Sequence, residues 1–212
     1  MRRRFSYADR AVVLALVSRL LRYPDEDLAA DLPVLADAAG GLPREPGEPL
    51  LRLCAHLGRP SLLELQAEYV ATFDLRRRNC LYLTYFAGGD TRRRGLALWR
   101  FADLYRRRGS SVAEGELADF LPALLELAAQ SPDDAEPLDA LVAHQAAISV
   151  LGRSLADDRS PWADAVTALE RVLPRPSPAA VAAAERLLAE GPPAEQVGIE
   201  PYDPAAQEVL QP

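Results

Sequence analysis

Apolar residues recur every three or four positions along most of this chain. Between residues 9 and 22 they form one face of a helix, with Asp9 as its N-cap and Pro24 as its stop, because the residue before a proline avoids the α conformation. The members of this face are Val13, Leu16, Val17, Leu20 and Leu21. The same period predicts further helices over residues 26–40, 48–57, 60–73, 91–108, 117–129, 138–155, 162–173 and 178–190.

The composition agrees with a helical chain. Hydrophobic residues make up 49% of the 212 residues, which excludes a disordered protein. Leu and Ala dominate, whereas the β-branched residues that favour strands are scarce. We therefore predict an all-α fold, a single-domain helical bundle over residues 1–190. Residues 191–212 are rich in proline and have no period, which predicts a mobile or loosely docked C-terminal tail.

The net charge of −7 is distributed unevenly. Residues 75–108 carry ten arginines and two aspartates, a local charge of +8, which leaves −15 for the remainder. A helical nucleic-acid-binding regulator that uses the basic segment is one alternative. The acidic remainder and the lack of a convincing helix-turn-helix pattern argue against it, and we expect no nucleic-acid partner.

The chain carries no motif of a catalytic centre. It has no glycine-rich phosphate loop, no G-x-S-x-G elbow and no H-E-x-x-H, so we expect no enzyme activity. Its two cysteines and two histidines lack zinc-finger spacing, and we expect neither metal nor cofactor. No stretch approaches the roughly 18 apolar residues of a membrane span. The start, Arg2-Arg3-Arg4-Phe5, is not followed by a cleavage site, so we expect a cytoplasmic protein without direct membrane insertion.

Aromatic residues gather in the middle of the chain, at Tyr69, Phe73, Tyr82, Tyr85 and Phe86. Tyr69 and Phe73 are four residues apart and therefore share a helix face. The other three fall in the least regular segment, just before Gly88 and Gly89. Aromatic rings on a segment that can shift would cover an apolar groove for an amphipathic peptide. The alternative is that these rings belong to the core, which we favour for Phe73 and Phe86.

A structural turn is predicted at Gly88, Gly89 and Asp90, because Asp90 or Thr91 can cap the helix that follows. Two arginines in the first turn of that helix, Arg92 and Arg94, are candidates for contact with acidic patches of a client or with an anionic pterin phosphate.

Four short segments carry a family likeness. They are Leu20-Leu21-Arg22-Tyr23-Pro24-Asp25, Tyr69-x-x-x-Phe73-Asp74, Asp90-Thr91-Arg92-x-Arg94-Gly95-x-Ala97-Leu98 and Leu117-Ala118-Asp119-Phe120-Leu121-Pro122. In order and spacing they resemble the NarJ family, the nitrate reductase molybdenum cofactor assembly chaperones or "delta subunits" among the TorD-like chaperones. Phe120 stands where that family carries a histidine after the aspartate.

The resemblance implies a system-specific chaperone. Such a protein binds the N-terminal segment of the nitrate reductase catalytic (alpha) subunit and holds it for insertion of molybdenum cofactor and iron–sulfur clusters. The candidate peptide-binding residues are Tyr69, Phe73, Tyr82 and Tyr85 from the aromatic cluster, together with Asp119. The resemblance implies that Asp119 pairs with an arginine of the basic client, and the alternative is that it is a charge at the N-terminus of a helix. Further implied partners are molybdenum cofactor delivery proteins. An alternative client is another molybdoenzyme, of the dimethyl sulfoxide or trimethylamine oxide reductase type.

Overall fold

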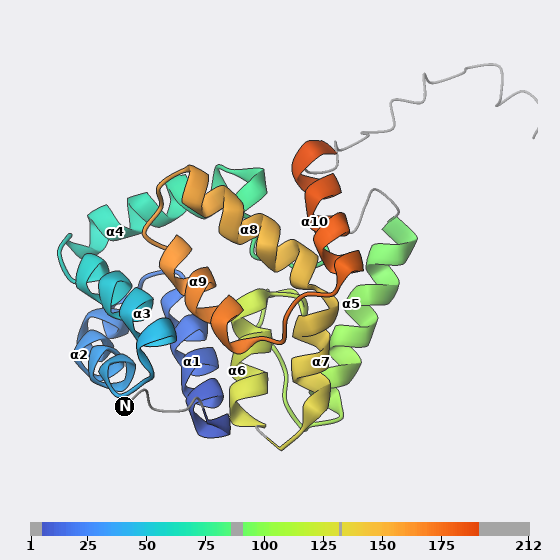
Figure 1. Cartoon of the computed structure of the whole chain (residues 1–212), viewed down its shortest axis with the longest axis horizontal. Helices are drawn as coiled ribbons and strands as arrows, with labels where there is room; N and C mark the ends of the chain where they lie inside the picture. Colours follow the sequence, from blue (N-terminus) through green and yellow to red (C-terminus); the bar gives the residue numbers. More distant parts are fainter. Residues whose placement is uncertain (1–5, 86–90, 132, 191–212) are drawn as a thin grey trace, which may run out of the picture.

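The computed structural model describes residues 6–85, 91–131 and 133–190, with only the backbone for residues 91–93. Within these ranges the fold is all-α, which confirms the predicted fold class (Figure 1). The α-helices are α1 Tyr7–Leu20, α2 Glu26–Gly40, α3 Arg44–Leu57, α4 Leu62–Tyr69, α5 Thr91–Arg106, α6 Leu121–Gln130, α7 Ala135–Ala143, α8 Gln145–Asp157, α9 Ala163–Val172 and α10 Pro178–Glu190. A π-helical turn, η1 Val70–Asp74, and a 3₁₀ turn, η2 Arg77–Asn79, follow α4. The predicted tail, residues 191–212, lies outside the described residues.

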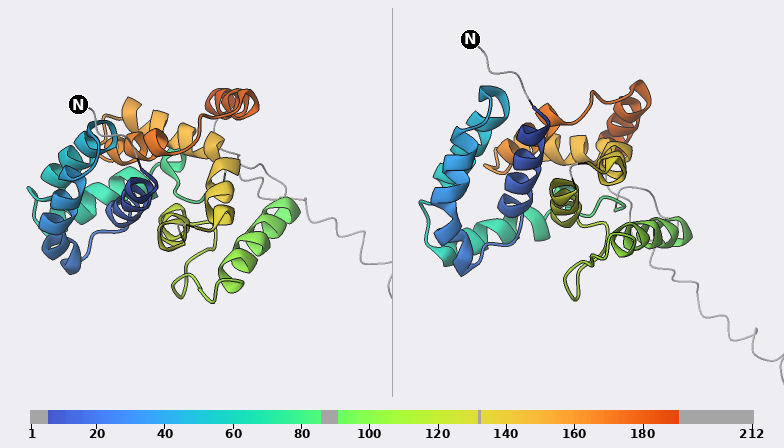
Figure 2. Two further views of the ribbon diagram at one scale, coloured as in Figure 1. Left: turned by 60° about the horizontal axis from the view of Figure 1, so that its bottom comes forward. Right: turned by 90° about the horizontal axis from the view of Figure 1, so that it is seen from below.

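Helix α1 forms the centre of the bundle, because it packs against both α6 and α9. Helix α3 also packs against α9, and α2 covers α3 on the outside (Figure 1). Figure 2 shows α5 at the opposite edge of the molecule from α2 and α3. The core therefore lies around α1, whose residues Val13 and Val17 are fully buried, as is its C-cap, Leu21. No helix in the described ranges is both long and apolar enough to cross a membrane.

Local capping sets the starts of α1 and α4. The prediction that Asp9 caps α1 is wrong, because the N-cap is Ser6. The Ser6 hydroxyl accepts from the Asp9 N–H at 3.1 Å, and the Asp9 carboxylate accepts from the Ser6 N–H at 2.7 Å. Ser61 and Glu64 form the same capping box before α4, so Pro60 precedes the helix and does not lie in its first turn.

The single helix predicted over residues 138–155 is two helices. Helices α7 and α8 meet at His144, whose backbone is not helical. The His144 ring hydrogen-bonds through Nδ1 to the Ala140 carbonyl oxygen at 2.8 Å, and it lies 5.1 Å from the Phe101 ring of α5. The sequence pattern does not reveal this break, because apolar residues keep the helical period on both sides of His144.

Three arginines of the basic segment, residues 75–108, pair with acidic side chains elsewhere in the fold. Arg107 and Arg108 at the end of α5 bind Glu136 of α7 at 2.5 and 2.9 Å. Hydrogen bonds from Arg107 and then Arg108 lower the pKa of Glu136 to about 2. Arg76 binds Asp158 at 2.5 Å. These arginines therefore join helices together, and their charge is compensated within the fold.

Candidate peptide-binding site

A change of helix type positions the first two predicted aromatic residues. Helix α4 continues into the π-helical turn η1, where the Leu75 N–H bonds to the Val70 carbonyl at 3.1 Å. Such turns are rare and often occur at functional sites. Tyr69 and Phe73 project from this junction on one face, as their spacing predicts, and their ring centroids lie 4.6 Å apart.

The two rings belong to a larger aromatic cluster around Trp162, which is fully buried before α9. The Trp162 ring meets Phe73 edge-on at 5.4 Å and Tyr69 at 5.8 Å. Trp162 Nε1–H donates to the Leu20 carbonyl at 3.0 Å, and the Tyr69 hydroxyl donates to the Leu21 carbonyl at 3.0 Å. Side chains from two distant segments thus cap the C-terminal end of α1.

The irregular segment before residue 86 is held by a short antiparallel pairing. The Leu121 N–H donates to the Leu81 carbonyl at 2.8 Å, and the Leu83 N–H donates to the Asp119 carbonyl at 3.0 Å. This pairing stacks the Tyr82 and Phe120 rings at 5.5 Å. It also explains why α6 begins at residue 121 and not at the predicted 117, since residues 119–121 are engaged with the other segment.

The Asp119 side chain fastens this pairing from inside. It is 0% exposed. The Asp119 Oδ2 atom accepts two hydrogen bonds from Thr84, one from its backbone N–H at 2.9 Å and one from its hydroxyl at 2.6 Å. Its Oδ1 is buried without a hydrogen-bond partner among the described residues. The carboxylate therefore holds residues 81–84, which carry Tyr82, against the start of α6.

We expect Asp119→Ala to lower the free energy of unfolding by about 2–4 kcal/mol, because it leaves two buried donors of Thr84 unpaired. Thr84→Val removes only the hydroxyl bond and is expected to cost about 1 kcal/mol. Urea unfolding followed by circular dichroism measures both. Equal unfolding midpoints for wild type and Asp119→Ala would contradict the conclusion that Asp119 holds residues 81–84 against the start of α6.

A cleft of about 390 Å³ lies where these elements meet, between the end of α1, η1, residues 80–82 and the approach to α6. Its aromatic wall consists of Tyr23, Tyr69, Phe73, Tyr82 and Phe120. Tyr69 and Phe73 are buried in its floor, whereas Tyr82 and Phe120 are half-buried and Tyr23 is exposed at its mouth. Three of the five predicted peptide-binding residues thus line one cleft.

The charged residues of the cleft are mainly acidic. Asp25, Asp74 and Glu116 line it together with a single cation, Arg22. Asp25 binds Arg19 at 2.7 Å, and Glu116 accepts from the Tyr82 hydroxyl at 2.7 Å. Asp74 is exposed and has no partner among the described residues. The mouth of an aromatic cleft therefore presents an unpaired carboxylate, which can attract a basic, amphipathic segment.

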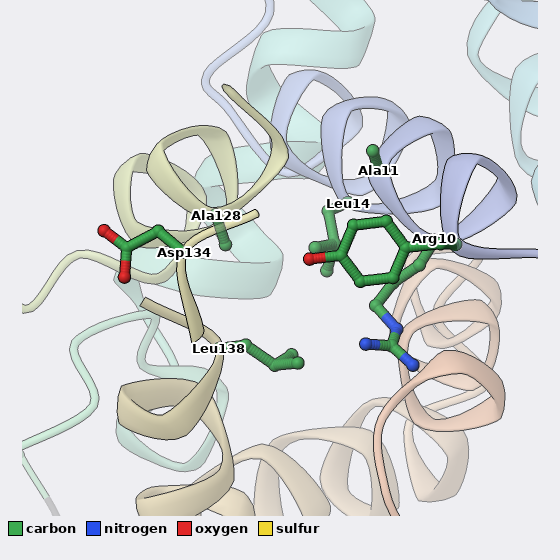
Figure 3. Close-up of a pocket in the computed structure, with 7 residues that line it drawn as sticks. Arg10, Ala11, Leu14, Ala128, Asp134 and Leu138 are labelled. Atoms are coloured by element: carbon green, nitrogen blue, oxygen red, sulfur yellow. The ribbon is translucent and has the colours of Figure 1, made fainter. Parts of the chain in front are cut away.

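A much smaller hollow is less suited to a peptide. Figure 3 shows this hollow between α1, α6 and α7, with Leu14 and Leu138 on its apolar side and Arg10 beside it. Its volume of about 20 Å³ has room for roughly one water molecule. The residues that the structure describes include no group of three or more His, Cys, Asp or Glu side chains that could hold a metal ion.

The remaining predicted site residues lie elsewhere. Tyr85 packs beside a second apolar cluster built on Val150 and Ala184, between α8 and α10, and Asp119 is enclosed as described above. Arg94 is half-buried on α5. Gly88, Gly89, Asp90, Phe86 and the side chain of Arg92 fall outside the described residues.

Five aromatic or acidic residues of the cleft did not appear in the sequence prediction of the site, namely Tyr23, Asp25, Asp74, Glu116 and Phe120. All except Glu116 lie inside a segment that carried the family likeness, so a search of those segments for aromatic and acidic residues would have found them. Glu116 has no such signal, because only the folding of residues 110–120 brings it to Tyr82.

Comparison with known proteins gives a consistent family. The nitrate reductase delta subunit family matches residues 24–168. The nitrate reductase-like protein NarX of Mycobacterium tuberculosis (strain H37Rv) is 38% identical over 163 residues, which are 76% of this chain and 24% of NarX. The probable nitrate reductase molybdenum cofactor assembly chaperone NarJ of Bacillus subtilis is 36% identical over 130 residues, 60% of this chain and 70% of that protein.

The nitrate reductase molybdenum cofactor assembly chaperone NarJ of Escherichia coli (strain K12) is 34% identical over 124 residues, 57% of this chain and 52% of that protein. The matched part of this chain thus spans about a quarter of the mycobacterial relative and about half of the Escherichia coli one. The family match covers most of the aromatic cleft, from Asp25 through Tyr69 and Tyr82 to Phe120.

Proposed function

We propose, from the premise that this chain belongs to the nitrate reductase delta subunit family, that it is an assembly chaperone for a nitrate reductase. Two relatives that bear the name of molybdenum cofactor assembly chaperone support this role. In this proposal the protein works by binding a client and not by catalysis, and it acts in the cytoplasm, where it meets molybdenum cofactor delivery proteins.

The proposed client is the N-terminal segment of the nitrate reductase catalytic (alpha) subunit, bound in the aromatic cleft. One observation carries this proposal: an exposed carboxylate, Asp74, which has no ion-pair partner within residues 6–85, 91–131 and 133–190, stands at the mouth of a cleft floored by Tyr69 and Phe73. An amphipathic segment can place apolar side chains against the rings and a basic side chain beside Asp74. Tyr82 contributes a wall of the cleft, on residues 81–84, which backbone pairing and the Asp119 carboxylate hold against the start of α6.

The predicted pairing of Asp119 with a client arginine stays a prediction. Because Asp119 is fully enclosed, a client can reach its unpaired Oδ1 only after residues 81–84 separate from residues 119–121. We therefore propose Asp74 as the first charged contact and Asp119 as the residue that sets the position of Tyr82. Contacts of Tyr85, Arg92 and Arg94 with the client likewise stay predictions.

The test is calorimetric titration with a synthetic peptide of the catalytic subunit's N-terminal segment. We expect binding with a negative heat-capacity change, since apolar surface is buried. Asp74→Asn is expected to weaken binding by about 0.2–1 kcal/mol, the range for an exposed ion pair. The matched control is Glu185→Gln on α10, an exposed carboxylate away from the cleft, which should leave affinity unchanged.

Two outcomes would contradict this proposal. If the wild-type protein binds no such peptide, the proposed client is wrong. If it binds the N-terminal peptide of a dimethyl sulfoxide or trimethylamine oxide reductase more tightly, that reductase is the client. Equal weakening by Asp74→Asn and Glu185→Gln would show a general charge effect and move the site away from the cleft.

A further inference from the structure

The aromatic cleft continues into a second hollow of about 230 Å³ on the far side of Phe120. This hollow lies between the loop of residues 110–116 and the exposed side of α6. It shares Arg22, Glu116 and Phe120 with the aromatic cleft, so the two form one continuous depression.

Tyr105, from the last turns of α5, lines this second hollow. The side chain is 4% exposed, and its hydroxyl has no hydrogen-bond partner among the described residues. A buried hydroxyl without a partner destabilises the folded protein unless something else supplies one. Of the buried polar side-chain atoms that the structure describes along this hollow, it is the one without a partner.

The surroundings restrict what can bind the Tyr105 hydroxyl. Burial, and then the charge of Glu126, raise the pKa of the phenol above its ordinary value, so the group remains a hydrogen-bond donor at neutral pH. Glu116 and Glu126 stand in the walls, which disfavours an anion such as phosphate. The ligand must therefore offer a neutral oxygen acceptor.

The charged side chains and the amide of the hollow are already engaged, whereas the hydroxyls of Ser110 and Ser111 also line it. Arg22 pairs with Glu126, and the Gln130 amide donates to the other oxygen of Glu126 at 3.2 Å. Val112, Ala123 and Leu127 add apolar surface between them. A segment of extended or helical peptide meets these conditions, because its main-chain carbonyls are neutral acceptors and its aliphatic side chains fit apolar walls.

We propose that this hollow is a second subsite of the peptide-binding cleft, in which the Tyr105 hydroxyl donates a hydrogen bond to a main-chain carbonyl oxygen of the bound segment. The inference rests on the proposed function and adds a length requirement to it. A client segment fills the aromatic cleft first, passes Phe120 and ends over Tyr105. Segments too short to pass Phe120 bind through the aromatic cleft alone.

The test compares Tyr105→Phe with wild type, using the catalytic-subunit peptide at full length and nested truncations from each end. For the long peptide, the loss of one hydrogen bond is expected to raise Kd about three- to tenfold. For peptides shortened from the end that lies over Tyr105, the two proteins are expected to bind equally. The matched control is Tyr7→Phe. Tyr7 lies at the start of α1, whereas the aromatic cleft lies at its end, so this variant should behave as wild type for every peptide.

A second measurement separates ligand binding from a structural role. Because the Tyr105 hydroxyl has no hydrogen-bond partner in the part of the chain that the structure describes, Tyr105→Phe is expected to melt at the same temperature as wild type or higher. A lower melting temperature with unchanged Kd would assign the hydroxyl to the fold and overturn the subsite. Unchanged Kd for the long peptide overturns it too, while leaving the proposed function intact; failure of wild type to bind any peptide overturns both.

Discussion

A strain that lacks this protein is expected to accumulate the catalytic subunit of its nitrate reductase without molybdenum cofactor, so that nitrate reduction falls to background. The reason is order of assembly, since a cofactor that ends up buried can enter only before its subunit closes. Molybdenum content of the purified subunit and reductase activity measure the effect. Fully metallated, active enzyme in such a strain, with no second chaperone present, would contradict the proposed function.

Complementation of this strain links the effect to the cleft. The wild-type gene and the Glu185→Gln variant should restore activity to the same level. Asp74→Asn should restore less when the protein is expressed at low level, because its weaker binding leaves more client unoccupied. At high expression level the difference in activity should disappear, because a higher concentration of the variant occupies the client in spite of its weaker binding.

Replacing Trp162 by Ala is expected to lower the free energy of unfolding by about 3–5 kcal/mol. The substitution removes a fully buried ring that touches Tyr69 and Phe73, and it leaves the Leu20 carbonyl without its donor. The chain supplies its own control, since the other tryptophan, Trp99, is 61% exposed on α5. Trp99→Ala should change the free energy of unfolding by less than about 0.5 kcal/mol.

Urea unfolding followed by far-ultraviolet circular dichroism suits this pair, because the signal comes from helices and not from the substituted rings. The Trp162→Ala protein should also lose affinity for the client peptide at temperatures where it is still folded, since the Trp162 ring of the wild-type protein supports the floor of the cleft. Similar destabilisation by the two substitutions would contradict the central place assigned to Trp162.

The sequence predicted several helix ends that depend on local chemistry, although it placed the N-cap of α1 at Asp9 and not at Ser6. Helix α2 begins after Asp25 and ends at Gly40, and α10 begins after Ser177, whose hydroxyl accepts from the Ala180 N–H at 3.1 Å. These caps need only residues three or four positions away. The NarJ family prediction is also confirmed, because the nitrate reductase delta subunit family matches residues 24–168, which contain three of the four segments and the end of the first.

The failures occur where partners distant in sequence decide the structure. The break at His144 involves the Phe101 ring of another helix, and the late start of α6 follows from the pairing of residues 81–84 with residues 119–121. Neither partner is visible to a periodicity argument. The site was predicted in part for the same reason: helical spacing placed Tyr69 beside Phe73, whereas only the fold brings Glu116 to Tyr82.

The capping of α1 has a consequence for synthesis of the protein. The two carbonyls at its end receive their donors from residues 48 and 142 positions further along the chain. Contacts that close such long loops form late in folding, because the loss of chain entropy precedes their gain. A nascent chain that has not yet released Trp162 from the ribosome therefore has no finished cleft floor, so in the proposed function the cleft can hold a client only after residue 162 has emerged.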